Sequence, residues 1–286
     1  MLDLVRLRVL AAVARRGSVT AAAKELHYSQ PSVSHHLARL EAETGAKLLQ
    51  RVGRGVRLTQ AGQLLADRAA EIVGRVDSAA AELSAHVGLS AGRVRLAGFS
   101  SAMSTLVPAA AAALASEHPG LELGLTDAHP PEALQMLRAG QVDVAVIFRY
   151  DDTAPEDDVI RLAHLLDDPT YLLSAGQPAT LTDHRDSTWI AGCDRCRSHL
   201  LELCAKAGFT PRVAYTSDDM VVMQALVAAG MGVTTMPGLA LRAHRLPALA
   251  AVELPDSTRH IYAATYGEPP DPPAVAALVA ALTGVA

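Results

Sequence analysis

Several features that define other classes of protein are scarce in this sequence of 286 residues. Aromatic residues make up only 3% of the chain. No run of about 18 apolar residues is free of charge, so no transmembrane helix is expected. The first ten residues lack the basic start and apolar core of a secretory leader. With three cysteines the chain offers no disulfide framework, and we expect reduced thiols and a cytoplasmic location.

The sequence holds enough hydrophobic residues to form folded cores. Its charge is unevenly distributed along the chain. Half of the residues are hydrophobic and 19% are charged, which excludes a disordered chain, and the length suggests about two domains. The first 60 residues hold ten Lys/Arg against four Asp/Glu, a net charge of +6, whereas the remainder carries −11. A basic head on an acidic body indicates a polyanionic partner, most simply nucleic acid. The alternative is a chance imbalance on a solvated surface.

The first 45 residues predict three short helices. Apolar residues at helical spacing continue to Gly17, which stops the first helix. Ser18 caps a second helix over residues 19–26, and Ser29 caps a third that has Pro31 in its first turn. Such a helix-turn-helix places its last helix in the major groove of DNA.

The outer face of the third helix is polar, weakly basic and nearly free of acids. Its residues are Gln30, Ser32, Ser34, His35, His36 and Arg39. Glutamine pairs with adenine, serine with several base edges or phosphates, and arginine with guanine or phosphate. Taken singly, each of these residues also fits an ordinary solvated helix face, so the indication comes from the whole series.

Residues 47–59 predict a two-stranded wing. Two short extended runs flank Gly53-Arg54-Gly55, with Arg51 and Arg57 on either side. Arginines on such a hairpin reach phosphates or a minor groove.

The stretch GSVTAAAKELHYSQPSVSHHLARLEAETGAKLLQRVGRGVRLTQAG resembles the head of LysR-type transcriptional regulators. The motifs GS-x-T-x-AA, SQP-x-VS, LE-x-x-x-G and LT-x-AG all occur in register. The resemblance implies a winged helix-turn-helix in residues 1–59 that binds double-stranded DNA, with part of the third helix at the groove and two arginines on the wing. The expected DNA-binding residues are Ser29, Gln30, Pro31, Ser32, Ser34, His35, Arg39, Arg51 and Arg54.

Two positions depart from the family pattern. Val19 and Leu49 stand where aromatic residues are frequent, which indicates a repacked core. His35-His36 stands where Arg-Gln or Gln-x is common. This pair either makes DNA affinity sensitive to pH or consists of two exposed histidines with water and phosphate contacts.

Residues 60–88 predict one long linker helix, capped by Thr59. Apolar residues recur with spacings of 4, 3, 4, 4, 3 and 4, which is a heptad-like seam. They are Leu65, Ala69, Ile72, Val76, Ala80, Leu83 and Val87. A homodimer through this helix provides the two heads that a dyad operator needs, whereas the alternative is packing against the chain's own body. The resemblance implies the same dimer, often paired into a homotetramer.

The remaining sequence alternates strands and helices, which predicts an α/β body with parallel strands. The expected strands are residues 93–97, 121–126, 142–148, 171–173, 188–190, 213–215, 232–236 and 260–265. The segments EALQMLRAGQVDVAVI and DDMVVMQALVAAGMGVTTMPGLAL resemble the LysR-type effector domain. The resemblance implies two lobes of periplasmic-binding-protein type, with crossings near residues 162 and 265. Lobe I would comprise residues 91–162 and 265–286, and lobe II residues 163–264.

A small-molecule effector is expected in the cleft between the lobes, at the carboxyl ends of the strands. Arg149 is the best candidate for a charged anchor, and Asp127 argues against a purely anionic ligand. The candidate effector-binding residues are Ser100, Ser101, Thr126, His129, Phe148, Arg149, Gly192, Cys193, Thr216 and Thr234. No cofactor and no metal are expected.

The cysteines leave three alternatives open. Cys193, Cys196, His199 and Cys204 form the pattern C-x2-C-x2-H-x4-C, whose atoms zinc accepts. On one helix, however, Cys196 and Cys204 would lie about 12 Å apart, which is awkward for one metal ion. The thiols are otherwise structural, or Cys193 and Cys196 sense oxidants or electrophiles.

Two functional classes remain. In the first, an effector moves the lobes, the linker helices change the spacing of the heads, and access of RNA polymerase changes. In the second, the body is an enzyme tethered to DNA. The sequence contains no G-x-S-x-G elbow, P-loop or H-E-x-x-H motif, so we expect a regulator and not an enzyme.

Overall fold

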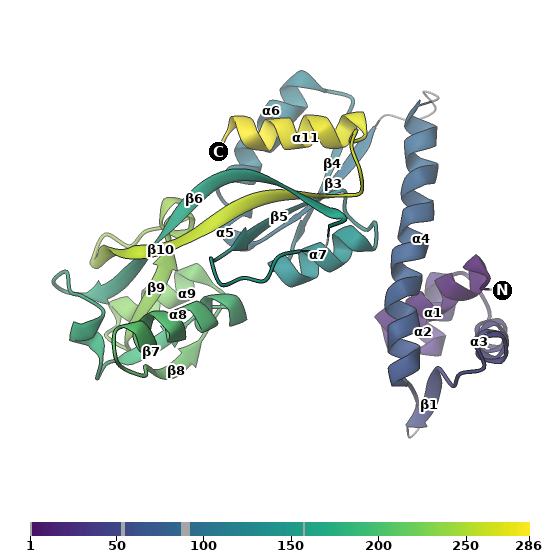
Figure 1. Cartoon of the computed structure of the whole chain (residues 1–286), viewed down its shortest axis with the longest axis horizontal. Coiled ribbons are helices and arrows are strands. Elements are labelled where there is room, and N and C mark those ends of the chain that lie inside the picture. Colours follow the sequence, from purple (N-terminus) through teal and green to yellow (C-terminus); the bar gives the residue numbers. More distant parts are fainter. Residues whose placement is uncertain (1, 53–54, 87–91, 157) are drawn as a thin grey trace. The chain divides into compact units, whose positions relative to one another are not determined.

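The computed structural model describes residues 2–52, 55–86, 92–156 and 158–286 (Figure 1). The chain divides into two compact units, Met1–Ala91 with Gln135–Val142 and Gly92–Leu134 with Asp143–Ala286. Residues 2–58 are called the head and residues 92–286 the body. No helix within the described ranges is long and apolar enough to span a membrane.

The head is built from α1 (Leu4–Arg16), α2 (Val19–Glu25) and α3 (Gln30–Thr44). The hydroxyls of Ser18 and Ser29 cap α2 and α3 by accepting hydrogen bonds from backbone N–H groups of the first turn. Gly17 ends α1 in the left-handed conformation, at the stop that the sequence predicts. Leu10, Val33 and Leu40 are fully buried where the helices meet.

The wing consists of β1 (Leu49–Val52) and β2 (Gly55–Leu58), which pair antiparallel. Glu41 on α3 fixes its base, because its carboxylate accepts hydrogen bonds from the backbone N–H groups of Leu48 (2.8 Å) and Leu49 (3.2 Å). Thr59 then joins the wing to the linker helix. Its hydroxyl donates to the carbonyl of Lys47 (2.7 Å) and accepts from the N–H of Gly62 (3.0 Å).

The linker helix is α4 (Gln60–His86). One of its faces packs against the core of the head through Ala66, Ala69 and Val73, with Leu65 partly buried beside them. Leu65 and Ala69 therefore belong to the chain's own core and not to the expected seam. Large apolar side chains further along remain exposed, namely Ile72, Val76 and Leu83. Val87 lies outside the described residues.

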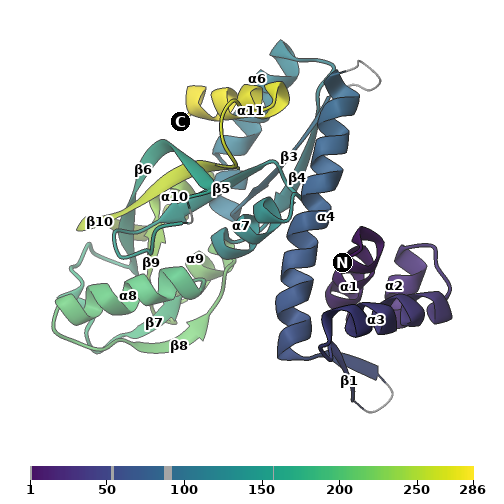
Figure 2. The same cartoon turned by 45° about the vertical axis from the view of Figure 1, so that its right-hand side comes forward.

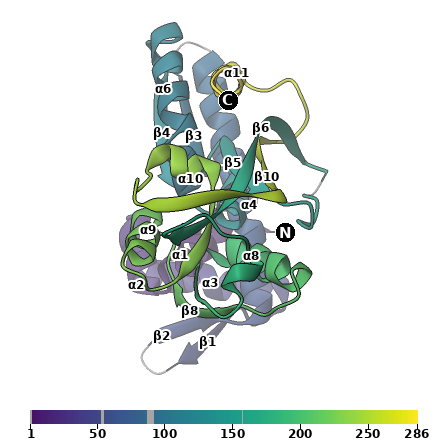
Figure 3. The same ribbon diagram turned by 90° about the vertical axis from the view of Figure 1, so that its left-hand side faces the viewer.

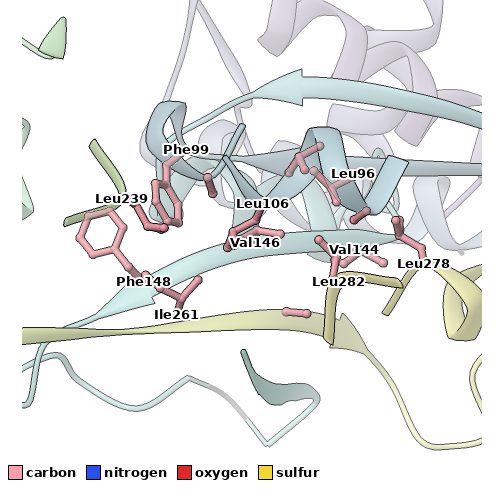
Figure 4. Close-up of a cluster of buried hydrophobic side chains, with 14 of the residues drawn as sticks. Leu96, Phe99, Leu106, Val144, Val146, Phe148, Leu239, Ile261, Leu278 and Leu282 are labelled. Atoms are coloured by element: carbon pink, nitrogen blue, oxygen red, sulfur yellow. The ribbon is translucent and has the colours of Figure 1, made fainter. Parts of the chain in front are cut away.

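The body contains one eight-stranded sheet with the order β4-β3-β5-β10-β6-β9-β7-β8. Its first part, lobe I, holds the parallel strands β3 (Arg93–Gly98), β4 (Glu122–Asp127) and β5 (Val144–Arg149). The helices of this part are α5 (Ser100–Met103), α6 (Leu106–Glu117), α7 (Pro130–Arg138) and α11 (Pro273–Gly284). Helices α6 and α11 pack side by side over the buried strands (Figures 1 and 4).

Lobe II holds the parallel strands β7 (Thr188–Ala191), β8 (Arg212–Thr216) and β9 (Val233–Pro237). Its helices are the 3-10 turn η1 (Thr182–His184), α8 (Asp194–Lys206), α9 (Met220–Ala228) and α10 (Gly238–Ala243). Its core has two parts, one on each face of the sheet, because successive side chains of a strand point to opposite faces. Trp189 packs with Leu200 of α8 on one face, and Ile190 packs with Val227 of α9 on the other. Helices α8 and α9 thus cover opposite faces of the sheet (Figure 3).

Two long antiparallel strands, β6 (Ile160–Ala175) and β10 (Leu249–Tyr266), connect the lobes (Figure 2). Residues 260–264 of β10 pair with β5 of lobe I, whereas residues 170–173 of β6 pair with β9 of lobe II. The chain therefore passes between lobes near residues 167–170 and 254–258, and not at the expected crossings near 162 and 265. The short predicted strands 171–173 and 260–265 are only parts of these long ones, because polar residues interrupt their apolar pattern.

Candidate DNA and effector sites

The exposed face of α3 carries the side chains that the sequence assigns to the DNA groove. Gln30, Pro31, Ser34 and His35 are exposed, whereas Val33 and Leu37 turn inward. Gln30 stands at the start of α3, and in helix-turn-helix proteins the N-terminal residues of this helix contact base edges in the major groove. Ser29 and Ser32 are linked to each other, since the Ser29 hydroxyl accepts from the Ser32 N–H at 3.3 Å.

The charges around α3 leave a cation facing solvent. Arg39 is 61% exposed at its side chain, with Glu43 at 4.0 Å. Glu43 also binds Arg6 on α1, which shares its negative charge between two arginines. An exposed guanidinium beside the polar face is suited to a phosphate contact.

The two histidines of α3 have different surroundings. His36 is half-buried and stacks on Tyr28, with ring centroids 5.8 Å apart. His35 is exposed and meets His36 edge-on at 6.3 Å. Only His35 is therefore open to a ligand lying along the helix.

The structure describes the two strands of the wing and leaves out the residues between them. Arg51 lies on β1 opposite Val56, and Arg57 is exposed on β2 opposite Gln50. Arg54 lies outside the described residues. The backbone of the wing thus presents Arg51 and Arg57 on its two strands.

A pocket lies between the lobes at the carboxyl ends of the parallel strands, and it measures about 530 Å³ when the solvent-filled space at its mouth is included. Its walls come from both lobes and from β10. They comprise Phe99, Ser100, Ser101, His129, Phe148, Gly192, Cys193, Cys196, Ser217, Asp218, Met220, Met223, Thr235, Met236, Pro237, Ala240 and Arg259. Its mixture of apolar walls with a few polar groups is typical of small-molecule sites.

Six of the ten expected effector-binding residues lie in these walls, namely Ser100, Ser101, His129, Phe148, Gly192 and Cys193. Four do not. Thr126 and Thr216 are exposed at strand ends outside the pocket. Thr234 is buried, and its hydroxyl donates to the carbonyl of Ile190 at 2.8 Å. Its neighbour Thr235 lines the pocket instead, because successive strand residues point to opposite faces.

Arg149 is not the charged anchor of the pocket. Its guanidinium donates to the carbonyl of Thr153 at 3.0 Å and so folds back onto its own loop. The cation in the pocket wall is Arg259 of β10, whose side chain is 3% exposed.

Three kinds of contact hold Arg259. Its Nη2 lies 2.7 Å from Oδ2 of Asp168 and donates to the hydroxyl of Ser101 at 2.8 Å. The guanidinium also lies 4.9 Å and 4.8 Å from the ring centroids of Phe99 and Phe148. Asp168 accepts a further hydrogen bond from the backbone N–H of Leu239 (2.8 Å), so the pair ties both lobes to β10. No sequence motif marks this pair, because 91 residues separate its members.

Cys193 and Cys196 form a close thiol pair in the pocket wall. Helix α8 begins at Asp194, which sets Cys193 at its cap and Cys196 in its first turn. The two Sγ atoms lie 3.1 Å apart and share a hydrogen bond. This bond lowers the pKa of Cys193 to about 6 and, with burial, raises that of Cys196 well above its ordinary value.

The other two residues of the cysteine pattern lie elsewhere. His199 binds the hydroxyl of Ser257 at 2.8 Å and stacks on Tyr150. Cys204 is buried in lobe II, where burial raises its pKa to about 11. Among the described residues the four do not converge on one point, so the alternative of a zinc ion held by all four is wrong.

A winged helix-turn-helix, a long helix and a two-lobed body with a pocket together define a ligand-responsive DNA-binding regulator. Family models agree: "Bacterial regulatory helix-turn-helix protein, lysR family" matches residues 4–63, and "LysR substrate binding domain" matches residues 88–286. The chain belongs to the LysR family of transcriptional regulators. The expected fold class and regulatory function are thereby confirmed, and the relatives are regulators and not enzymes.

Two relatives and two solved structures illustrate the similarity. The HTH-type transcriptional regulator TdfR of Cupriavidus pinatubonensis is 30% identical over 269 residues, 88% of each chain. The probable regulator LrrA of Synechococcus elongatus is 29% identical over 255 residues, covering 86% of this chain and 87% of the relative. The crystal structure of CbnR matches with a TM-score of 0.70 at 24% identity, covering 100% and 99%. A full-length OxyR variant from Pseudomonas aeruginosa matches with a TM-score of 0.71 at 20% identity, covering 99% and 95%.

Proposed function

We propose that this regulator binds a dyad operator as a homodimer, pairs into a homotetramer, and responds to a small effector in the interlobe pocket. The single observation that carries the effector proposal is the composition of the pocket. Its walls come from lobe I, lobe II and the connecting strand β10. A ligand that touches all three favours one arrangement of the lobes over others, and this differential affinity shifts the population. The heads then change their hold on DNA and the access of RNA polymerase.

The lining indicates the class of effector. Phe99, Phe148 and three methionines supply apolar surface, while Ser101 and Arg259 supply polar atoms. Because Asp168 already balances the charge of Arg259, the site does not demand a strongly anionic ligand. We therefore propose a compact, largely apolar molecule with one hydrogen-bonding end.

Filling the pocket should abolish this response. Met220 stands half-buried in the pocket wall at the start of α9, so Met220→Trp projects an indole into the ligand's space. Small aromatic acids and amides can be screened by thermal shift on the full chain, and hits tested for their effect on DNA affinity. We expect hits to raise the melting temperature of the wild type and to leave Met220→Trp unchanged.

Met231→Trp is the matched control, because Met231 is exposed and outside the pocket. It should respond to ligands like the wild type. Hits that stabilise Met220→Trp as strongly as the wild type would contradict the proposed site.

The exposed apolar residues of α4 support a homodimer. Ile72, Val76 and Leu83 are 43%, 44% and 65% exposed and lie on one helix face, four and seven residues apart. A second copy of α4 would cover them, and two heads linked in this way match the two halves of a dyad operator.

Charges on this face should separate the protomers. In Ile72→Glu/Val76→Glu, four carboxylates per dimer would be buried without partners, so we expect a monomer at micromolar concentration. Size-exclusion chromatography with light scattering measures the mass. Gln60→Glu/Gln63→Glu adds equal charge at exposed polar positions of the same helix and should keep the wild-type mass. A dimeric Ile72→Glu/Val76→Glu variant would locate the interface elsewhere.

The thiol pair favours a second candidate function, a response to hydroperoxides. The Cys193 thiolate would attack a peroxide oxygen, the O–O bond would break, and the leaving alkoxide would take up a proton. Cys196 would then attack the resulting sulfenic acid, releasing water and forming the S–S bond. The Sγ atoms need to approach from 3.1 Å to about 2.05 Å, a small movement in the first turn of a helix.

The reactivity of Cys193 should extend to unusually low pH. Because its pKa is about 6, alkylation by iodoacetamide should reach half its maximal rate near pH 6, compared with about pH 8.5 for an ordinary thiol. In Cys196→Ala the midpoint should move upward, since the hydrogen bond that stabilises the thiolate is lost. Peptide mass spectrometry identifies the modified residue, with buried Cys204 as the unreactive internal control. A wild-type midpoint above about pH 8, close to that of an ordinary thiol, would contradict this role.

A further inference from the structure

Three metal-ligating side chains meet on the two strands that connect the lobes. His164 and Asp167 lie on β6, and His260 lies on β10 directly opposite Asp167. One ligand atom from each falls within 4.8 Å of the others. The two histidines are far apart in the sequence, so no short motif reveals the group.

A β-bulge brings these side chains to one face. Residues three apart on a regular strand point to opposite sides, which would separate His164 from Asp167. Between the pairs Ile261–Leu166 and Tyr262–His164, however, β10 advances one residue and β6 advances two. The extra residue, Leu165, reverses the alternation. Bulges often re-aim side chains at functional sites in this way.

The distances suit a common centre. His164 Nε2 and His260 Nδ1 each lie 2.7 Å from Oδ1 of Asp167. Tetrahedral zinc, with bonds of about 2.0–2.1 Å, holds its ligand atoms about 3.3 Å apart. The His164 and Asp167 side chains are 50% and 58% exposed, so they have room to open by that amount.

The surroundings of His260 favour metal binding. Its other ring nitrogen, Nε2, lies 3.1 Å from a carboxylate oxygen of Asp151. A histidine that binds metal through one nitrogen almost always donates its other N–H to a carboxylate or carbonyl, which fixes the tautomer and strengthens the ligand. His260 thus has a metal-facing nitrogen and a supporting carboxylate.

We propose that His164, Asp167 and His260 bind a divalent transition-metal ion of the zinc, cobalt or nickel class, with Asp151 as the supporting carboxylate. Two imidazoles and one carboxylate match the preferences of these ions better than those of Mg²⁺ or Ca²⁺. Water completes the coordination.

The site is separate from the effector pocket and positioned to influence it. Arg259 and His260 are neighbours on β10 and therefore point to opposite faces, one toward the pocket and one toward the metal ligands. An ion here would fasten β6 to β10 at the passage between lobes. It would thereby restrict movement of one lobe against the other.

The test uses the chain of 286 residues in a Cys193→Ser/Cys196→Ser background, so that thiols do not compete for the ion. Isothermal titration with Zn²⁺, and with Co²⁺ monitored by visible absorption, should give one ion per chain with micromolar affinity. His164→Ala should weaken Zn²⁺ binding by about 30-fold or more, and Asp151→Asn by about tenfold through His260. Zn²⁺ should raise the melting temperature of the parent and not that of His164→Ala.

His118→Ala removes an exposed histidine outside the group and should bind Zn²⁺ like the parent. Equal affinity in the parent and His164→Ala would overturn the proposal, as would the absence of binding at millimolar Zn²⁺. Zn²⁺ binding by the unsubstituted chain that disappears in the cysteine background would assign the ion to the thiols instead.

Discussion

Replacing Gln30 and Ser34 by alanine should lower the affinity for the operator about 100-fold while leaving the affinity for random DNA nearly unchanged. Both side chains are exposed on the face of α3, and neither carries charge. Base contacts of this kind contribute about 1–3 kcal/mol each to discrimination, whereas phosphate contacts supply the nonspecific affinity. Loss of two uncharged side chains that contact bases should therefore reduce sequence specificity and leave the electrostatic attraction to phosphates unchanged.

Fluorescence anisotropy at two salt concentrations measures both affinities, with the DNA upstream of the chain's own gene as the first operator candidate. Arg39→Ala provides a contrast, because loss of a phosphate contact should weaken operator and random DNA alike and reduce the salt dependence by about one ion. Gln177→Ala/Ser116→Ala makes the same substitutions at exposed positions of the body and should change neither affinity. Wild-type operator affinity in the Gln30/Ser34 variant would show that α3 is not the reader.

The head was predictable because its determinants are local. Capping serines, a helix-stopping glycine and a glycine-containing hairpin act within a few residues of the elements they define. Ser18, Ser29 and Gly17 perform the expected roles. The alternating strands and helices of the body predicted an α/β fold on the same principle, and family membership confirms it.

The pocket was only partly predictable, because short-range sequence patterns do not determine which side chains face it. Thr235 faces the pocket and Thr234 does not, because successive strand residues point to opposite faces. Arg149 points away from the pocket, because its guanidinium donates a hydrogen bond to the carbonyl of Thr153. Arg259 lies in the polar stretch that interrupts the apolar pattern of β10. Its partner is Asp168 on another strand, so only the pairing of β6 with β10 brings the charged groups together.

The linker helix shows the same limit. The heptad-like series of apolar residues predicted a single dimer face. In the structure these residues belong to two faces of α4, one that packs on the head through Ala69 and one that stays exposed at Ile72 and Val76. On this α-helix, the apolar face against the core and the exposed apolar face lie less than a quarter turn apart. Spacing alone therefore does not separate them.

Removing one member of the buried Asp168–Arg259 pair should destabilise the body by about 3–5 kcal/mol, because the remaining charge stays buried without a partner. Both side chains are 3% exposed. Asp168→Asn is the sharpest change, since the amide oxygen can still accept the Leu239 N–H while the negative charge is lost. Trp189 is the only tryptophan and is buried in lobe II, so its fluorescence during urea unfolding reports on the body.

Asp168→Asn/Arg259→Met removes both charges and should recover most of the lost stability, because a buried pair is often no better than an apolar replacement of similar size. The exposed pair Glu202–Lys206 is the control, and Glu202→Gln should leave the midpoint of urea unfolding nearly unchanged. An Asp168→Asn variant within about 1 kcal/mol of the wild type, the range of exposed pairs, would mean that water reaches Arg259 through the pocket. If the double variant regains stability but does not respond to the effector, the pair is needed for ligand binding more than for folding.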